Sequence, residues 1–315
     1  MLGALPNITR EYGISGVVKA NSPAESRPRH TAIFAGFEED IANIKSGWSK
    51  SVQPFESVFN NVGASWAFGI ETVLNYFDAN IRRMSHGNSL SDFQVLQAFL
   101  TSADRVVQEL SVQKNDVNGS ACGKIVFLHF DSTDHAGHVS GYPSPGYVKA
   151  VVEADNFAQS VFDFFRKNIP QELMNATTFI VTSDHGVSEY GHGGGSLNEV
   201  YVPIFMWGSG IVGEQFHPVL RKPDSKSGYP ILLNQIDICP LLASLLGIKM
   251  PSNSMATIER IKSTSFFPFL VSGGEEPRVV QDLLEETNQL VRTLSKLRNM
   301  NSFPRSMSIG KHKIV

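Results

Sequence analysis

Two short apolar runs, each followed by aspartates and histidines, constrain the fold of this chain more than any other feature. The run from Lys124 to Phe130 reads KIVFLHF and the run from Thr177 to Thr182 reads TTFIVT. Both are rich in β-forming residues, which is typical of buried strands. Because residues 146–165 carry apolar side chains at helical spacing, the order strand, helix, strand predicts a crossover between two parallel strands of one sheet.

The polar groups just beyond the two runs are the types that divalent metal ions prefer. Five side chains of these types are present: Asp134, His138, Asp184, His185 and His192. In open α/β sheets, ligands bind outside the carboxyl ends of the strands, so these side chains are expected to share one pocket. Two metals in that pocket would clamp the attacking and leaving oxygens of a phosphoryl displacement.

Each piece alone also has an ordinary structural explanation. An aspartate four residues before a histidine occurs often by chance, and Asp184 could cap a helix. His192 lies in a glycine-rich run that would let the backbone approach a site closely, but such a histidine is commonly a surface residue. The occurrence of all these groups in order, each after a predicted strand, favours the metal interpretation. His129, inside the first run, is interpreted as a packed core histidine.

Other groups are expected near the same site. A helix that has Pro28 in its first turn would point its N-terminus toward the metals and favour a phosphate. Arg27 and Arg29 would then either add positive charge there or be solvated at the helix end. Glu199 would either orient a ligand histidine or cap a loop.

The composition is that of an ordinary globular protein. With 315 residues, 42% hydrophobic and 18% charged, the chain is long enough for one large α/β domain. Its net charge of −3 argues against a nucleic-acid-binding surface. No apolar run is long enough to span a bilayer. The two cysteines, Cys122 and Cys239, make no disulfide framework, and both are expected to be buried.

Several segments together resemble a known enzyme family. They read ESRPRHTAIFAGFEED, FLHFDSTDHAGH, TFIVTSDHG, GHGGGSLNE, VPIFMWGSGI and LLNQIDICPLLASLLGIKMPSNS. These segments are similar to the luminal catalytic domain of GPI ethanolamine phosphate transferases, which belong to the alkaline phosphatase superfamily. The first segment resembles most closely the type 1 members of that family, and the resemblance covers nearly all of residues 11–260.

The resemblance implies an α/β, alkaline-phosphatase-like fold, with a mostly parallel central sheet flanked by helices on both faces. This metal-binding domain would occupy residues 1–265, and residues 266–315 would form a C-terminal helix and a basic tail. The resemblance further implies two divalent metals, zinc or manganese. Carried over to this chain, one metal would be held by Asp134, His138 and His192, and the other by Asp184 and His185.

The activity implied by the resemblance is transfer of phosphoethanolamine from phosphatidylethanolamine to the first mannose of a GPI-anchor precursor. Such an enzyme works in the lumen of the endoplasmic reticulum, and its membrane-spanning segments are missing here, so the chain is expected to be a truncated luminal piece. Three sequons would permit glycosylation in that compartment, at Asn7, Asn118 and Asn175.

Two departures from the family pattern bear on activity. The family reads Pro-Thr-Glu-Ser-Arg-Pro-Gly-His before the helix, with threonine as the nucleophile, and here Ala24 stands in the threonine position. Alanine has no oxygen to attack phosphorus, whereas Ser22 and Ser26 lie two positions to either side as possible substitutes. The family also has an aspartate ligand upstream, and residues 1–39 contain no aspartate. One metal site is therefore expected to be incomplete.

Three interpretations of function follow. The first is the phosphoethanolamine transferase domain, favoured by the PSNS and GW segments. The second is a catalytically dead or truncated paralogue of that family, favoured by the missing threonine and aspartate. The third is a soluble, metal-dependent phosphodiesterase of the same superfamily.

Overall fold

The structure, a computed structural model, describes residues 3–47, 55–77, 81–83, 91–111, 123–211 and 231–257. The chain divides into one unit of residues 1–274 and another of residues 275–315. The second unit lies outside the described residues, as do the predicted C-terminal helix and basic tail. The predicted domain boundary at residue 265 stays a prediction.

The described strands form two separate sheets. Their bounds are β1 Gly13–Lys19, β2 Ala64–Phe68, β3 Ile81–Arg83, β4 Lys124–Leu128, β5 Thr178–Thr182, β6 Tyr201–Gly208 and β7 Ile231–Asn234. One sheet has the order β5-β6-β1-β7 and the other has the order β3-β2-β4. Strand β6 is antiparallel to β1 and β5, and every other pairing is parallel.

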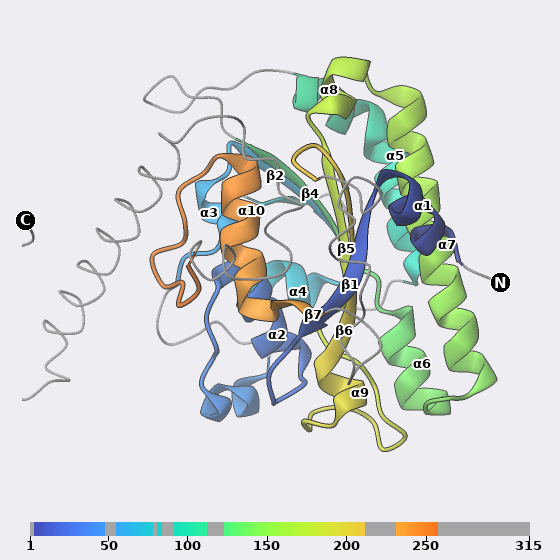
Figure 1. Cartoon of the computed structure of the whole chain (residues 1–315), viewed down its shortest axis with the longest axis vertical. Coiled ribbons are helices and arrows are strands. Elements are labelled where there is room, and N and C mark those ends of the chain that lie inside the picture. Colours follow the sequence, from blue (N-terminus) through green and yellow to red (C-terminus); the bar gives the residue numbers. More distant parts are fainter. Residues whose placement is uncertain are drawn as a thin grey trace, which may run out of the picture. The chain divides into compact units, whose positions relative to one another are not determined.

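Helices cover both faces of these strands. Figure 1 shows α1, α5 and α7 on one side, and α2, α3 and α10 on the other. The helix bounds are α1 Ala4–Tyr12, α2 Ser26–Ala35, α3 Val58–Asn61, α4 Glu71–Tyr76, α5 Asp92–Ser111, α6 Ser132–Ser140, α7 Pro145–Asn168, α8 Gln171–Asn175, α9 Leu197–Val200 and α10 Ile238–Leu246. The predicted α/β class is confirmed. Of the described helices, none has the length and apolarity that a bilayer crossing demands.

The crossover between the two apolar runs differs from the prediction. The connection from β4 to β5 contains α6, α7 and α8, and the two strands belong to different sheets and do not pair with each other. Both were expected to be buried, and both are only half-buried along their whole length. The reason is that each is the outer strand of its sheet and both line the same cavity.

Helix α2 is the element that brings the N-terminal part of the chain to the site. Nine of its ten residues are buried, and Gly36, with a φ of 73°, ends it in the left-handed region that favours glycine. The ring of Phe34 on α2 packs 4.8 Å from Phe59 and 4.9 Å from Phe127, measured between ring centroids. Each such aromatic pair contributes roughly 0.5–1.5 kcal/mol beyond the area it buries. This packing anchors the last turn of α2 in the core, and the first residue of the helix, Ser26, lies 3.0 Å from His185, just beyond the carboxyl end of β5.

Burial predicts an inert thiol at Cys239 on α10. The side chain is fully buried, and burial raises the pKa of its thiol to about 12. At pH 8 only about one thiol in ten thousand would then be the reactive thiolate. We expect iodoacetamide to label Cys239 in guanidinium but not in the folded chain, as measured by peptide mass spectrometry. Labelling of the folded chain at the denatured rate would contradict this packing. Cys122 lies outside the described residues.

Candidate metal centre

Asp134 and His138 lie on helix α6, which the sequence analysis did not predict. The nine-residue helix begins four residues after β4 ends. Residues four apart on a helix lie on the same face, and Asp134 Oδ2 is 3.3 Å from His138 Nε2. The helix, rather than a loop, therefore sets the distance between these two predicted ligands.

His192 completes this first group from the other side. Its Nε2 lies 2.9 Å from His138 Nε2 and 3.4 Å from Asp134 Oδ1. Its Nδ1 donates a hydrogen bond to the Ala24 carbonyl at 2.9 Å, which leaves Nε2 directed at the group. The glycine run suits this approach, because Gly193 has a φ of 102°, a backbone conformation that residues with a side chain rarely adopt.

The first group suits a divalent metal ion. One ligand atom each from Asp134, His138 and His192 lies within 4.8 Å of the others. Asp134 Oδ1 is buried and has no hydrogen-bond partner among the residues that the structure describes, which leaves its lone pairs available to a cation. Two imidazoles and one carboxylate are a ligand set that zinc accepts, with a fourth position open to water or substrate.

The second group lies at the carboxyl end of β5. Asp184 Oδ2 is 3.5 Å from His185 Nε2 and 3.5 Å from His30 Nδ1. His185 Nδ1 donates to the Gly186 carbonyl at 3.1 Å, so its Nε2 is the nitrogen that faces the group. His30, on α2, was not among the predicted ligands. The only signal for it in the sequence was its place in the resemblance, because the family pattern ends in Pro-Gly-His and this chain reads Pro-Arg-His there.

The two groups are neighbours. The rings of His185 and His192 are stacked, with their centroids 4.2 Å apart. All five predicted ligands therefore converge at one end of the strands, although they come from three separate segments. Metal binding by these residues stays a prediction.

Charge and burial act in opposite directions on Asp184. Burial would raise the pKa of its carboxyl, but the electrostatic attraction of His185, and next that of His30, holds that pKa below its usual value. Burial lowers the pKa of His129 to about 3, and His30 adds to the effect. Its ring is therefore neutral at pH 7 and packs 5.1 Å from His30 and 6.2 Å from Phe127, as expected of a core histidine.

Of the two serines considered as substitute nucleophiles, Ser26 is the one within the site. Its hydroxyl donates to His185 Nε2 at 3.0 Å from the first residue of α2. Ser22 is exposed and lies next to Gly195. Ala24 between them is fully buried and contributes only its backbone.

The two arginines expected near the phosphate site are not solvated, because both are buried and paired with carboxylates. Arg27 is buried in an ion pair with Glu39, with 2.6 Å between the charged atoms. Arg29 is buried and paired with Glu38. Glu199 accepts a hydrogen bond from Ser188 at 2.8 Å, so it braces the loop before His192 rather than a ligand histidine.

Asp92 is a further residue of the site that the sequence did not reveal. It is buried at the start of α5, and its Oδ1 accepts backbone hydrogen bonds from Asp131 at 2.8 Å and Ser132 at 3.0 Å. These are the residues at which α6 begins, so Asp92 caps that helix from another element. It thereby fixes the helix that carries Asp134 and His138.

Comparison with known proteins identifies first the fold and then the family. The structure superposes with a TM-score of 0.52 on a protein in the alkaline phosphatase superfamily from Vibrio parahaemolyticus, at 17% identity over 78% of this chain and 61% of that one. It superposes with a TM-score of 0.50 on an inactive variant of murine ectonucleotide pyrophosphatase / phosphodiesterase 5 in complex with AMP, at 10% identity over 82% of this chain and 93% of that one. The fold is therefore that of the alkaline phosphatase superfamily.

The family of type I phosphodiesterases / nucleotide pyrophosphatases matches residues 26–202, more than half of the chain, and the chain belongs to this family.

Curated relatives narrow the similarity further. The chain is 30% identical over 285 residues to GPI ethanolamine phosphate transferase 1 of Homo sapiens. The aligned residues make up 83% of this chain and 30% of that protein. It is 29% identical over 326 residues to the enzyme of the same name from Schizosaccharomyces pombe, covering 94% of this chain and 34% of that protein. The chain thus spans about a third of the length of these relatives.

The geometry predicts at most one tightly held metal ion per chain. The first group has three convergent ligands, whereas the predicted ligands of the second are only Asp184 and His185. We expect equilibrium dialysis with zinc, followed by elemental analysis, to give about one ion, which the substitution His138→Ala removes. His135→Ala, an exposed neighbour on the same helix, is the matched control and should keep the ion. Two tightly held ions per chain would contradict this assignment.

Removal of the Asp92 cap should weaken metal binding without touching a ligand. We expect Asp92→Ala to lower zinc affinity roughly 10–100-fold, the usual effect of losing a group that orients ligands. Asp92→Asn keeps an oxygen acceptor and should recover most of the affinity. Competition with a chelator measures the change. Asp104→Ala, at an exposed position on the same helix, is the control; equal affinity of the two alanine variants would show that the cap does not position α6.

Proposed function

We propose that this chain is the metal-binding catalytic domain of an enzyme that transfers phosphoethanolamine from phosphatidylethanolamine to the first mannose of a GPI-anchor precursor. The observation that carries this proposal is the convergence of five ligand-type side chains at one end of the strands. The substrate class comes from the relatives, whose names are those of GPI ethanolamine phosphate transferases. It follows that the domain works at the luminal face of the endoplasmic reticulum membrane.

The residues around the first group suit a phosphodiester. A pocket of about 220 Å³ is lined by residues 25–28 at the start of α2 and by Asp134, His138 and His192. The N-terminus of a helix favours an anion through its partial positive charge. Divalent metals bound there would stabilise the charge that develops on the phosphoryl oxygens. The chain itself orients the imidazoles, through the Ala24 carbonyl for His192 and the Gly186 carbonyl for His185.

The missing nucleophile favours a second candidate, a member of this family that binds substrate but turns nothing over. Ala24 is fully buried at the position where the family pattern has threonine. The hydroxyl of Ser26 donates a hydrogen bond to His185. This contact favours the third candidate, a soluble phosphodiesterase in which Ser26 attacks phosphorus. Substitution of Ser22 and of Ser26 by alanine therefore discriminates between the catalytically dead domain and the phosphodiesterase.

The chain alone should not turn over a phosphodiester. Zinc-loaded protein is mixed with bis(p-nitrophenyl) phosphate or glycerophosphoethanolamine, and product is measured over hours. We expect no hydrolysis above the metal-only control, because the family nucleophile is absent. Hydrolysis that Ser26→Ala abolishes and Ser22→Ala spares would show that Ser26 has taken over and would favour the phosphodiesterase.

A chimera tests the substrate assignment directly. The matching segment of the Schizosaccharomyces pombe relative is replaced by this chain, and phosphoethanolamine on the mannolipid is measured by mass spectrometry. We expect little product with Ala24 and a clear increase with Ala24→Thr, which restores the hydroxyl. The double variant Ala24→Thr with His192→Ala should lose that increase. A folded, membrane-inserted Ala24→Thr chimera that makes no more product than its parent would contradict the assignment.

A further inference from the structure

Asp131 is a carboxylate beside the metal centre that its own helix does not use. It stands directly before the first residue of α6, where an aspartate side chain ordinarily accepts a hydrogen bond from the helix. Here Asp92 accepts the backbone hydrogen bonds of Asp131 and Ser132 instead, and the Asp131 side chain makes no capping bond. Among the residues that the structure describes, none forms an ion pair or a hydrogen bond with the Asp131 carboxylate. The charge is therefore held in place by its backbone and left without a partner.

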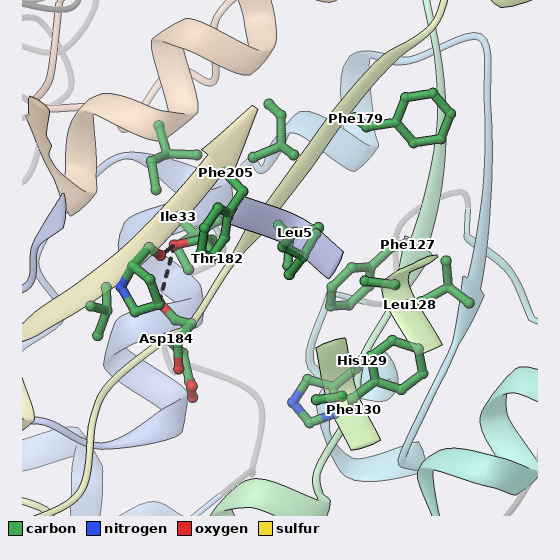
Figure 2. Close-up of a pocket in the computed structure, with 18 of the residues that line it drawn as sticks. Leu5, Ile33, Phe127, Leu128, His129, Phe130, Phe179, Thr182, Asp184 and Phe205 are labelled. Atoms are coloured by element: carbon green, nitrogen blue, oxygen red, sulfur yellow. Dashed lines mark hydrogen bonds between the residues drawn. The ribbon is translucent and has the colours of Figure 1, made fainter. Parts of the chain in front are cut away.

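The Asp131 carboxylate lies close to the metal ligands. Asp131 precedes Asp134 by three residues, and residues so spaced on a helix share one face, with their Cβ atoms roughly 5–6 Å apart. Both side chains line the same cavity. Figure 2 shows Phe130, the residue before Asp131, and Asp184 at one end of that cavity, away from Phe179. A cation at Asp131 would therefore lie within one helical turn of a phosphate held at the metal centre.

Negative charge is concentrated around Asp131. Burial raises the pKa of its carboxyl, and the carboxylates of Asp134, Asp92 and Asp184 raise it further. A neighbouring cation would offset this repulsion, because an opposite charge favours the ionised form of a carboxyl.

Two tyrosines form an aromatic corner on the same cavity. The rings of Tyr142 and Tyr147 meet edge to face, with their centroids 5.5 Å apart and an angle of 87° between their planes. Both rings line the cavity together with Asp131. Burial and the charges of Tyr142 and Asp134 raise the pKa of the Tyr147 hydroxyl, which indicates that this hydroxyl is near the metal ligand Asp134. The backbone of Tyr147 is fixed, since its N–H donates to the Ser144 side chain at 3.1 Å.

An organic ammonium ion suits this combination better than a metal ion does. Divalent metals select oxygen and nitrogen ligands, and the faces of the two rings supply neither. Ammonium ions are attracted to the faces of aromatic rings. A primary ammonium group also has three N–H donors, and its hydrogen bonds to a carboxylate are among the strong ones. A quaternary ammonium group has no N–H and could not use the carboxylate in this way.

We propose that Asp131, Tyr142 and Tyr147 bind the primary ammonium group of a phosphoethanolamine diester whose phosphate lies at the metal centre. The ammonium group donates a hydrogen bond to the Asp131 carboxylate, and the carbon atoms beside the nitrogen pack against the tyrosine rings. The short linker of ethanolamine matches the single helical turn between Asp131 and Asp134. This ammonium site rests on the proposed function and deepens it, because it selects the ethanolamine headgroup over quaternary and uncharged headgroups.

Binding of three matched diesters to the zinc-loaded chain tests the ammonium site without turnover. The probes are glycerophosphoethanolamine, glycerophosphocholine and glycerophosphoglycerol, and their affinities are measured by isothermal titration calorimetry at neutral pH. We expect the ethanolamine diester to bind roughly tenfold more tightly than the glycerol diester, since only the former makes the charged hydrogen bond. The choline diester should fall between the two, because it keeps the attraction to the rings but has no N–H to donate.

Variants separate the carboxylate from the rings. Asp131→Asn keeps the shape of the side chain, so the ethanolamine and choline diesters should bind it equally while the affinity for the glycerol diester stays unchanged. Glu153→Gln, at an exposed position on α7, is the matched control and should keep the preference for ethanolamine. Tyr142 is 39% exposed; Tyr142→Leu should weaken the preference for both ammonium diesters, and Tyr142→Phe should retain it. The tyrosine pair keeps the test decisive if Asp131→Asn does not fold.

Equal affinity of the unaltered chain for all three diesters, or no binding of any at millimolar concentration, would overturn the ammonium site. So would an Asp131→Asn variant that loses affinity for all three to the same extent, because Asp131 would then act through the metal centre. The chimera with Ala24→Thr distinguishes this failure from failure of the proposed function. Product that Asp131→Asn leaves unchanged would retain the transferase and reject the ammonium site, whereas a headgroup preference without any product would do the reverse.

Discussion

The position of the His192 imidazole is the constraint on which the site depends. Its Nδ1 is held by the Ala24 carbonyl, its Nε2 meets Asp134 and His138, and its face stacks on His185. One ring thus connects helix α6, the loop after β5 and the segment before α2. A glycine-rich loop suits that close approach, because Gly191 and Gly193, with φ angles of 100° and 102°, adopt a backbone conformation that other residues rarely reach.

The resemblance implies that Ala24 stands at the reactive position of the family, within a backbone that still orients the predicted ligands. Ala24 still supplies the carbonyl that orients His192, although it has no hydroxyl to attack phosphorus. Orientation of the ligands depends on backbone atoms and survives the substitution, whereas nucleophilic attack depends on a side chain and does not. This separation explains why the site retains ligand geometry in a chain that is not expected to turn substrate over.

Much of the fold was predictable from local patterns, and the rest depended on tertiary packing. The apolar runs predicted β4 and β5, and the 3.6-residue periodicity predicted α7. Helix α6 was missed because its sequence, STDHAGHVS, has little apolar periodicity and is capped by Asp92 from another helix. The placement of β4 and β5 in one sheet was wrong, because sequence spacing does not reveal which strands share a sheet. Arg27 and Arg29 gave no sign in the sequence that Glu39 and Glu38 would neutralise them.

The most direct measurement of the central claim is anomalous diffraction from crystals of this chain grown with zinc. Data collected on both sides of the zinc absorption edge locate the ion without reference to any assumed ligand. Our account predicts an anomalous peak within bonding distance, about 2.0–2.2 Å, of Asp134, His138 and His192. A zinc site elsewhere, with these three side chains bound only to one another or to water, would contradict it.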